Sequence, residues 1–381
     1  MDIYLDNAAT TQLDPEVLAA MLPYMTGLCG NPSSVHRYGC QAKAAVEKAR
    51  KTIARLFDVS PSEIVFTSGG TEGNNMLLRG IIEAVQIADV LTTPLEHLSV
   101  RVPLEALAKA GKISLSYVGV NQNGDFRLEE VAQWLSEHPN GLVSCMQVNH
   151  EMGNITDVVA IGQLCQSAGA FFHSDTIQAI YCGLLDLGSC HLAVGSAHKI
   201  HGPKGVGFVY IDAKASVAPF ITGGSQELNM RGGTENVAYI VGMAKALEIA
   251  FRDREKIATH LAAVKQHMVA LLKRAIPDII FNGHSASCTQ SSPHLLNISL
   301  PAAQAHDMLV YHLDIHGIAA STGSACTSGS ALGSPVIAAL QKGTNHAIRF
   351  SFSKYTTFAE VEKAVDLLAE WCGNPTSHGR R

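Results

Sequence analysis

Short apolar runs and amphipathic stretches alternate along the first two-thirds of the chain. Apolar residues spaced three and four positions apart predict helices, for example over residues 15–25 and 41–57. Between such stretches lie seven runs rich in β-branched and aromatic residues, which predict buried strands at 63–67, 88–93, 113–120, 141–148, 169–175, 192–198 and 206–211. This alternation indicates an α/β unit built on a mostly parallel sheet.

The last third of the chain has a different order of elements. A long helical pattern over 236–274 predicts a bridge to a smaller unit, in which strand-like and helical segments suggest an α+β arrangement. We therefore predict a large α/β domain over residues 15–250. The small α+β domain would combine residues 1–14 with 251–381 and carry a flexible segment at about 321–334.

Composition and charge narrow the class of protein. The 381 residues are 47% hydrophobic and carry a net charge of -5 with both signs mixed, so we expect a large core and no direct nucleic acid binding. The sequence has neither a run of about 18 apolar residues nor a signal-peptide pattern, which predicts a cytoplasmic protein outside the membrane. Nine scattered cysteines without a Cys-x-x-Cys pair argue against a disulfide framework and a zinc site.

A glycine-rich segment, SGGTEGNN at 68–75, follows a predicted strand and opens a helical pattern. Glycines allow a tight turn, and the N–H groups of a helix N-terminus can bind a phosphate. By itself the segment favours a plain turn capped by Thr71. It matches neither the dinucleotide fingerprint nor the P-loop.

A lysine between two predicted strands is the strongest catalytic candidate. In SAHKIHGPKG, Lys199 lies where removal from water would favour the neutral, nucleophilic amine, whereas Lys204 within the glycine-rich turn suits a solvated loop lysine. Such a lysine is the usual aldehyde-capturing group of pyridoxal phosphate enzymes. We favour Lys199 over Lys204.

Polar residues at the ends of other predicted strands could complete such a site. Asp175 in HSDTIQ could keep a pyridine nitrogen protonated, with Gln178 beside the ring hydroxyl, although an Asp here could equally cap a helix. His97 could stack on a cofactor ring and act as an acid or base, but one of 17 histidines is a weak signal. Arg349 could bind a carboxylate or form a structural ion pair.

A lone thiol, Cys326, lies in STGSACTSGS among small polar residues that cannot bury it. A thiol that accepts a sulfur atom and carries it elsewhere needs access and mobility, which such a segment supplies. The alternative is an inert surface cysteine, although an exposed thiol is prone to oxidation.

These motifs occur in one order that resembles the cysteine desulfurases, pyridoxal phosphate enzymes of the class V aminotransferase group. The likeness extends from YLDNAATT at 4–11 through RGGTEN at 231–236 to IRFSFSKYTT at 348–357. GSACTSG at 323–329 is similar to the group I members, which have a longer mobile cysteine loop. The resemblance implies fold type I with a large, mostly parallel sheet domain, a smaller α+β domain, and a homodimer with its active site at the subunit interface.

The resemblance also implies residue roles. Lys199 would bind the cofactor aldehyde, Cys326 would accept sulfur, and His97 would move protons. The residues around the cofactor would be Gly70, Thr71, His150, Asp175, Gln178, Ser196, His198 and, from the partner subunit, Thr234. Arg349 and Asn149 would contact the substrate, and no metal is expected.

The implied reaction converts L-cysteine to L-alanine and leaves a persulfide on Cys326 for a sulfur-acceptor protein. One residue departs from the family pattern: in VNHEMG, the relatives usually have a second Asn where this chain has His150. We expect this change to modify the substrate geometry or the pH response without abolishing activity. The alternatives are a class V aminotransferase, a selenocysteine lyase, or a catalytically idle sulfur-relay partner.

Overall fold

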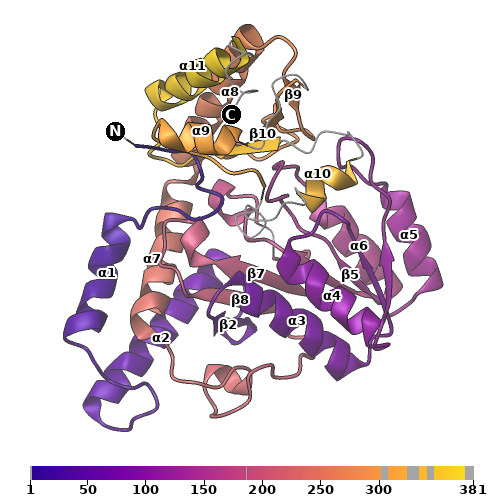
Figure 1. Ribbon diagram of the computed structural model, residues 1–381. Helices are drawn as coiled ribbons and strands as arrows, with labels where there is room; N and C mark the ends of the chain where they lie inside the picture. The colour runs from indigo at the N-terminus through magenta and orange to yellow at the C-terminus, as the bar shows by residue number, and fades with distance from the viewer. Residues whose placement is uncertain (1, 186, 302–307, 324–333, 341–346, 374–381) are drawn as a thin grey trace.

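A seven-stranded sheet forms the centre of the large unit (Figure 1). The computed structural model describes residues 2–185, 187–301, 308–323, 334–340 and 347–373. The strand order is β2-β8-β7-β6-β5-β3-β4, and β8 alone runs antiparallel to its two neighbours. The bounds are β2 Ile64–Thr67, β3 Asp89–Thr92, β4 Ser114–Tyr117, β5 Leu142–Ser144, β6 Phe171–Asp175, β7 Leu192–Ser196 and β8 Gly207–Ile211. The prediction of a mostly parallel sheet is confirmed.

Helices cover both faces of this sheet because consecutive strand side chains point to opposite sides. On one face, Val65 and Val194 pack with α3 (Gly70–Val85) and α4 (Leu98–Lys109). On the other, Phe66 and Phe172 belong to a core shared with the remaining helices of the unit. Those helices are α1 (Pro15–Thr26), α2 (Arg37–Leu56), α5 (Leu128–Glu137), α6 (Val158–Ala168) and α7 (Val237–Arg252).

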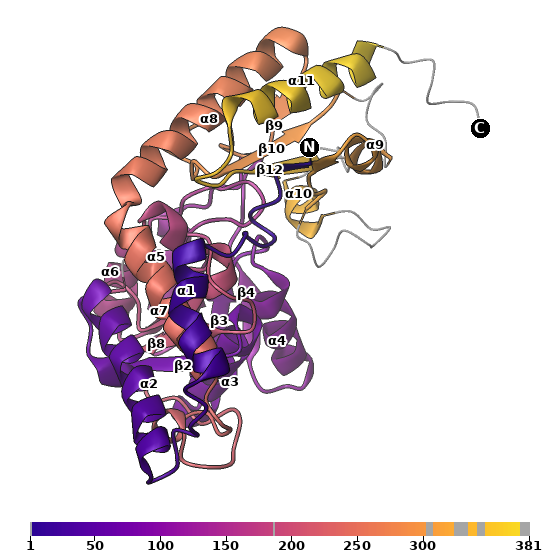
Figure 2. The same ribbon diagram turned by 90° about the vertical axis from the view of Figure 1, so that its left-hand side faces the viewer.

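The small unit is built on a three-stranded antiparallel sheet in the order β12-β10-β9. Its elements are α8 (Arg254–Ala275), β9 (Ile280–Phe281), β10 (Leu295–Ser299), α9 (Leu309–Ile315), α10 (Pro335–Ala339), β12 (Ala347–Ser351) and α11 (Phe358–Gly373). The helices α8 and α11 lie side by side (Figure 2). β1 (Ile3–Tyr4) pairs in parallel with β11 (Ile318–Ala319), so the N-terminus joins this unit, and the predicted α+β arrangement is present.

The long helical stretch predicted over 236–274 is two helices rather than one. α7 ends at Arg252 and α8 begins at Arg254, with Asp253 between them. α7 packs on α1 and α2, whereas α8 packs on α11, so the break lets each helix bury its apolar face in a different unit. The domain boundary placed at 250 stays a prediction, and the α7–α8 junction lies close to it.

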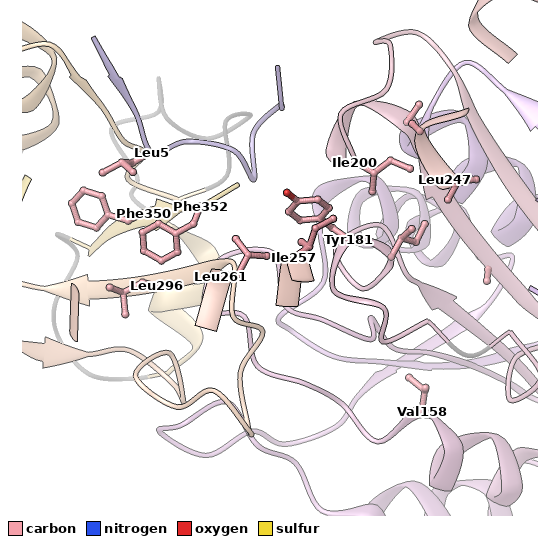
Figure 3. Close-up of a cluster of buried hydrophobic side chains, with 14 of the residues drawn as sticks. Leu5, Val158, Tyr181, Ile200, Leu247, Ile257, Leu261, Leu296, Phe350 and Phe352 are labelled. Carbon is pink, nitrogen blue, oxygen red and sulfur yellow. The ribbon is translucent and has the colours of Figure 1, made fainter. Parts of the chain in front are cut away.

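Both units share one hydrophobic cluster (Figure 3). Figure 3 shows Phe350 and Phe352 of the small unit on one side, Ile200 and Leu247 of the large unit on the other, and Tyr181 between them. The Tyr181 hydroxyl accepts a hydrogen bond from the Lys354 backbone N–H at 2.8 Å. This shared core fixes the orientation of β12 relative to the large sheet.

Four short 3-10 helices complete the described elements: η1 (Pro61–Glu63), η2 (Ile180–Cys182), η3 (Ala197–Lys199) and η4 (Glu227–Asn229). Within the described ranges, every helix is too short or too polar to cross a membrane.

Candidate active site

One cavity lies at the carboxyl ends of β6 and β7, where ligands of open α/β sheets usually bind. The N-terminus of α3, the turn before α4, the N-terminal segment and β12 contribute its other walls. Its lining residues are Ala8, Ala9, Gly70, Thr71, His97, Ser99, Met146, Val148, His150, Asp175, Ile177, Gln178, Ser196, His198, Lys199 and Arg349. The structure therefore brings most of the sequence-predicted residues together.

One end of the cavity has the features of an anion cradle. Gly69 precedes α3 with φ of 151° and no side-chain cap, so the first N–H groups of a 16-residue helix face this end. A Cβ at Gly70 would lie 2.2 Å from Ile177 Cδ1, so a larger residue would have to displace the Ile177 side chain. The buried hydroxyl of Ser196 finds no hydrogen-bond partner within the described chain, which leaves it available to a ligand.

Lys199 lies on the short helix that follows β7. Its Nζ donates to the backbone oxygens of Ala8 at 2.6 Å and Ala9 at 2.8 Å. Thr11 secures this N-terminal segment by donating from its hydroxyl to the His198 backbone oxygen at 2.9 Å. Lys204, in contrast, is exposed, so the geometry agrees with the preference for Lys199.

Asp175 ends β6 and is only 5% exposed. Its Oδ2 accepts from Asn74 Nδ2 at 2.8 Å, and its Oδ1 accepts from the Ile177 backbone N–H at 3.1 Å. The same Asn74 amide donates to Ser99 Oγ at 2.8 Å. Asn74 thus ties the carboxylate to the turn that holds His97.

His97 is the N-cap of α4, and its Nδ1 accepts the Ser99 backbone N–H at 3.1 Å. Because a backbone N–H can only donate, Nδ1 carries no proton and the neutral ring holds its hydrogen on Nε2. Burial, reinforced by the charge of His150, lowers the pKa of His97 to about 4. His97 is therefore neutral at physiological pH and carries a hydrogen on Nε2.

Gln178 is oriented by a histidine behind it. Its Oε1 lies 2.9 Å from His294 Nε2, and its Nε2 donates to the Ala8 backbone oxygen at 3.2 Å. Burial lowers the pKa of His294 to about 3, so this ring is neutral. The Ser292 hydroxyl lies 2.7 Å from His294 Nδ1, an arrangement in which Ser292 donates to Nδ1 and His294 donates from Nε2 to Gln178.

Arg349 on β12 is 1% exposed and also lines the cavity. Its Nη2 pairs with Asp6 Oδ1 at 2.9 Å, and its Nη1 donates to the His150 backbone oxygen at 2.9 Å. Its Nε has no hydrogen-bond partner in the described part of the chain. Its backbone pairs with Ser321, where the predicted cysteine segment begins. Cys326 itself lies outside the described residues.

Two predicted residues are not in the cavity wall. Thr234 is exposed and absent from the lining. The side chain of Asn149 bonds backbone groups: Nδ2 donates to the Leu95 backbone oxygen at 3.1 Å in the turn before α4, and Oδ1 accepts the backbone N–H groups of Glu151 and Met152. The expected contact between Asn149 and a substrate stays a prediction.

Sequence reasoning overlooked several residues that shape the site. Asn74 and Ser99 have no motif signal of their own, although Asn74 lies inside the glycine-rich segment. Asp6 lies within YLDNAATT, but its pairing with Arg349 spans 343 positions. Periodicity and motif spacing do not report such contacts.

Comparisons with known proteins agree with this geometry. The family model described as aminotransferase class-V matches residues 3–364. The chain is 36% identical over 375 residues to cysteine desulfurase IscS of Dictyoglomus turgidum, covering 96% of this chain and 93% of the relative. A solved NifS-like protein superposes with a TM-score of 0.89 at 33% identity, covering 98% of this chain and all of the other.

A second solved structure, SspA in complex with cysteine, has a TM-score of 0.77 at 28% identity and covers 93% of this chain and all of its own. The expected fold type I architecture is confirmed by these structures and by the mixed, mostly parallel sheet. The chain therefore belongs to the aminotransferase class V family, among its cysteine desulfurases.

Proposed function

We propose that this protein is a pyridoxal phosphate-dependent cysteine desulfurase that converts L-cysteine to L-alanine and passes the sulfur through Cys326 to an acceptor protein. The observation that carries the proposal is the cavity in which Lys199, Asp175, His97 and Arg349 meet the N-terminus of α3. Relatives with this name cover nearly the whole chain, and the similar SspA is known with cysteine.

The residues of the cavity fit pyridoxal phosphate. The unpartnered Ser196 hydroxyl and the Gly70 turn offer a phosphate site, together with Thr71 and His198. Asp175 would face the pyridine nitrogen, and Gln178, oriented by His294, would donate to the ring hydroxyl. The aldehyde would bind Lys199, which must then leave the Ala8 and Ala9 carbonyls.

The bound cofactor would supply an electron sink that weakens bonds next to the substrate nitrogen. The chain supplies the remaining steps. Arg349 binds the substrate carboxylate with its guanidinium, Lys199 Nζ removes the Cα proton, and neutral His97 exchanges protons with the substrate. Asp175 keeps its negative charge close to the ring nitrogen and favours a proton there.

Cys326 would take the sulfur. As a thiolate it attacks the substrate sulfur and forms an S–S bond, while the pair of electrons of the broken C–S bond stays on the substrate carbon, which is protonated to alanine. Cys326 follows Ser321 by 5 positions in the sequence, and the backbone of Ser321 is hydrogen-bonded to the backbone of Arg349.

A homodimer would complete the site. Thr234 lies on the surface of its own chain, where it could reach the cofactor phosphate of a partner subunit. Exposed apolar side chains, including Leu18, Leu22 and Val35, could be covered by that partner. We place the protein in the cytoplasm, without direct nucleic acid or membrane binding.

The covalent attachment of the cofactor tests the proposal. Borohydride reduction of the yellow protein followed by peptide mapping should label Lys199. Lys199→Ala should remove both the label and alanine formation from L-cysteine, whereas the exposed Lys204→Ala is the matched control and should keep them. A label on Lys204, or none, would contradict the assignment.

Cys326→Ala separates the proposal from the other activities of this fold. The variant should keep the absorbance of the bound cofactor and lose alanine and sulfide production in the presence of a thiol reductant. Full turnover would favour a class V aminotransferase or selenocysteine lyase. A wild-type protein that binds no cofactor near neutral pH would point to an idle partner protein.

A further inference from the structure

Two imidazole rings in the cavity wall meet edge to face. The ring centroids of His97 and His150 are 5.1 Å apart and their planes meet at 84°. Both rings line the cavity and both are largely removed from water. Because two positive rings at this distance repel strongly in a buried site, the pair takes up one proton far more readily than two. The chemistry of the site depends on which ring holds it.

A buried carboxylate stands behind one ring only. Glu151 is 1% exposed, and its Oε1 lies 3.5 Å from His150 Nε2, too far for a good hydrogen bond but close enough for a strong charge interaction. Its other oxygen accepts from the hydroxyl of Ser334, the N-cap of α10. Burial by itself would raise the pKa of Glu151, but His150, Ser334 and Arg349 hold it below its ordinary value. Glu151 is therefore a buried negative charge that stabilises a proton on His150.

The other ring is bonded in a way that opposes protonation. His97 Nδ1 accepts the Ser99 backbone N–H, and Ser99 Oγ lies 2.8 Å from the same nitrogen. A proton on Nδ1 would break the cap of α4 and leave the Ser99 N–H without its acceptor. The hydrogen bonds thus keep His97 neutral.

The remaining charges around the two rings do not reverse the preference for a proton on His150 over His97. Asp175 favours a proton on His97, whereas Lys199 and Arg349 disfavour it. Arg349 is itself paired with Asp6. The effect of Asp175 is smaller than those of burial and of His150, which come first among the influences on His97.

We propose that His150 and Glu151 form a carboxylate-backed imidazole that holds the added proton of the histidine pair and leaves His97 neutral, with its own hydrogen on Nε2. His150 then adds a second positive group beside Arg349. His150 Nδ1 and Arg349 Nε each lack a hydrogen-bond partner among the residues described, so both can donate to an anion in the cavity. Under the proposed function, this anion is the substrate carboxylate.

Histidine NMR of the cofactor-loaded protein tests the location of the proton. His150→Asn carries the residue that relatives usually have and removes the neighbouring charge, so the His97 titration midpoint should rise by roughly one pH unit or more. Glu151→Gln should raise it in the same direction, because His150 loses its counter-ion. As the pH of the wild type is lowered, the ¹⁵N shifts should show a second ring proton on His150 before one on His97.

The chain offers a matched control for these variants. His267 pairs with Glu362 at 2.9 Å on the surface of the small unit, so His267→Asn removes a similar carboxylate–imidazole pair far from the cavity and should leave the His97 midpoint unchanged. An unchanged His97 midpoint in His150→Asn would overturn the proposal even if Glu151→Gln does not fold.

Steady-state kinetics test separately whether His150 helps to bind the substrate carboxylate. The ratio of KM for L-cysteine between His150→Asn and wild type should be several-fold larger at about pH 6 than at about pH 8, because only a protonated ring attracts the carboxylate. A constant ratio would refute this role and leave the NMR result standing. A wild type that forms no alanine would refute the proposed function, while the location of the proton would still be decided by NMR.

Discussion

Asn74 connects three buried groups through one amide, and Asn74→Asp tests how much the site depends on it. Asn74 is 0% exposed; its Nδ2 donates to Asp175 Oδ2 and Ser99 Oγ, and its Oδ1 pairs with His173 Nε2. Aspartate has the same shape but places an oxygen where the NH₂ group was. Two carboxylates would then meet at the hydrogen-bond distance of 2.8 Å.

The folded variant can either keep both carboxylates charged or protonate one of them, and the loss of stability equals the smaller of these two free energies. Two full charges at this separation repel by roughly 6 kcal/mol at an effective dielectric constant of about 20. Protonating an ordinary aspartate of pKa about 3.9 costs roughly 4 kcal/mol at pH 7 and about 1.5 kcal/mol at pH 5. The folded protein therefore protonates the pair, and we expect the free energy of unfolding to fall by about 4 kcal/mol at pH 7.

The sign of the pH dependence is opposite to that of a salt-bridged carboxylate. The folded carboxylate pair holds a proton that the unfolded chain releases. The variant therefore keeps its stability below about pH 4, and its free energy of unfolding falls by about 1.4 kcal/mol per pH unit as the pH rises. Urea unfolding followed by circular dichroism at pH 5 and pH 7 measures this difference.

The neighbouring residue on α3 gives the control. Asn75 Nδ2 donates only to the Thr71 backbone oxygen at 3.0 Å and is half-buried, so Asn75→Asp should lose little stability at either pH. If Asn74→Asp lost the same amount at pH 5 and pH 7, or no more than Asn75→Asp, the assigned hydrogen-bond network would be wrong.

Two further predictions concern buried carboxyl groups outside this network. Burial raises the pKa of Glu96 to about 8, so the contribution of its protonated form to stability is present below about pH 4.5 and is lost as the pH rises through 8. Glu96→Gln should abolish this loss when urea midpoints are measured across that pH range. Glu227 forms a buried bidentate pair with Arg50 at 2.9 Å, and Glu227→Ala should cost about 3–5 kcal/mol because it leaves a buried, unpaired guanidinium. Glu16→Ala, which breaks the exposed pair with Arg252, should leave the urea midpoint unchanged, and an equal loss in both variants would contradict the burial argument.

The main sheet could be predicted from sequence because each strand is a short apolar run between turns. All seven predicted runs are strands, and polar residues at their ends, such as Asp175 and Ser196, line the cavity as expected of parallel strands. The break at Asp253 could not be predicted, because the helical pattern continues through it without glycine or proline. What ends α7 there is a change of packing partner, which a local pattern does not record.

The side-chain network of the site was the least predictable part. Asn74, Ser99 and Glu151 are held by hydrogen bonds to partners that lie 25 to 183 positions away. Their residue types are common, and their importance comes from burial and geometry. The unusual His150 was visible in the sequence, but its pairing with Glu151 and its position opposite His97 required the folded chain.

The first residues of the chain have a consequence for the order of assembly. Ile3 pairs with Ile318, Asp6 neutralises Arg349, and the carbonyls of Ala8 and Ala9 hold Lys199. Residues 3–6 are therefore synthesised long before the residues with which they pair, at positions 318 and 349. A nascent chain that ends before β12 can contain Lys199 and the anion cradle yet lacks the guanidinium of Arg349, so the lining of the cavity is completed only after β12 has been synthesised.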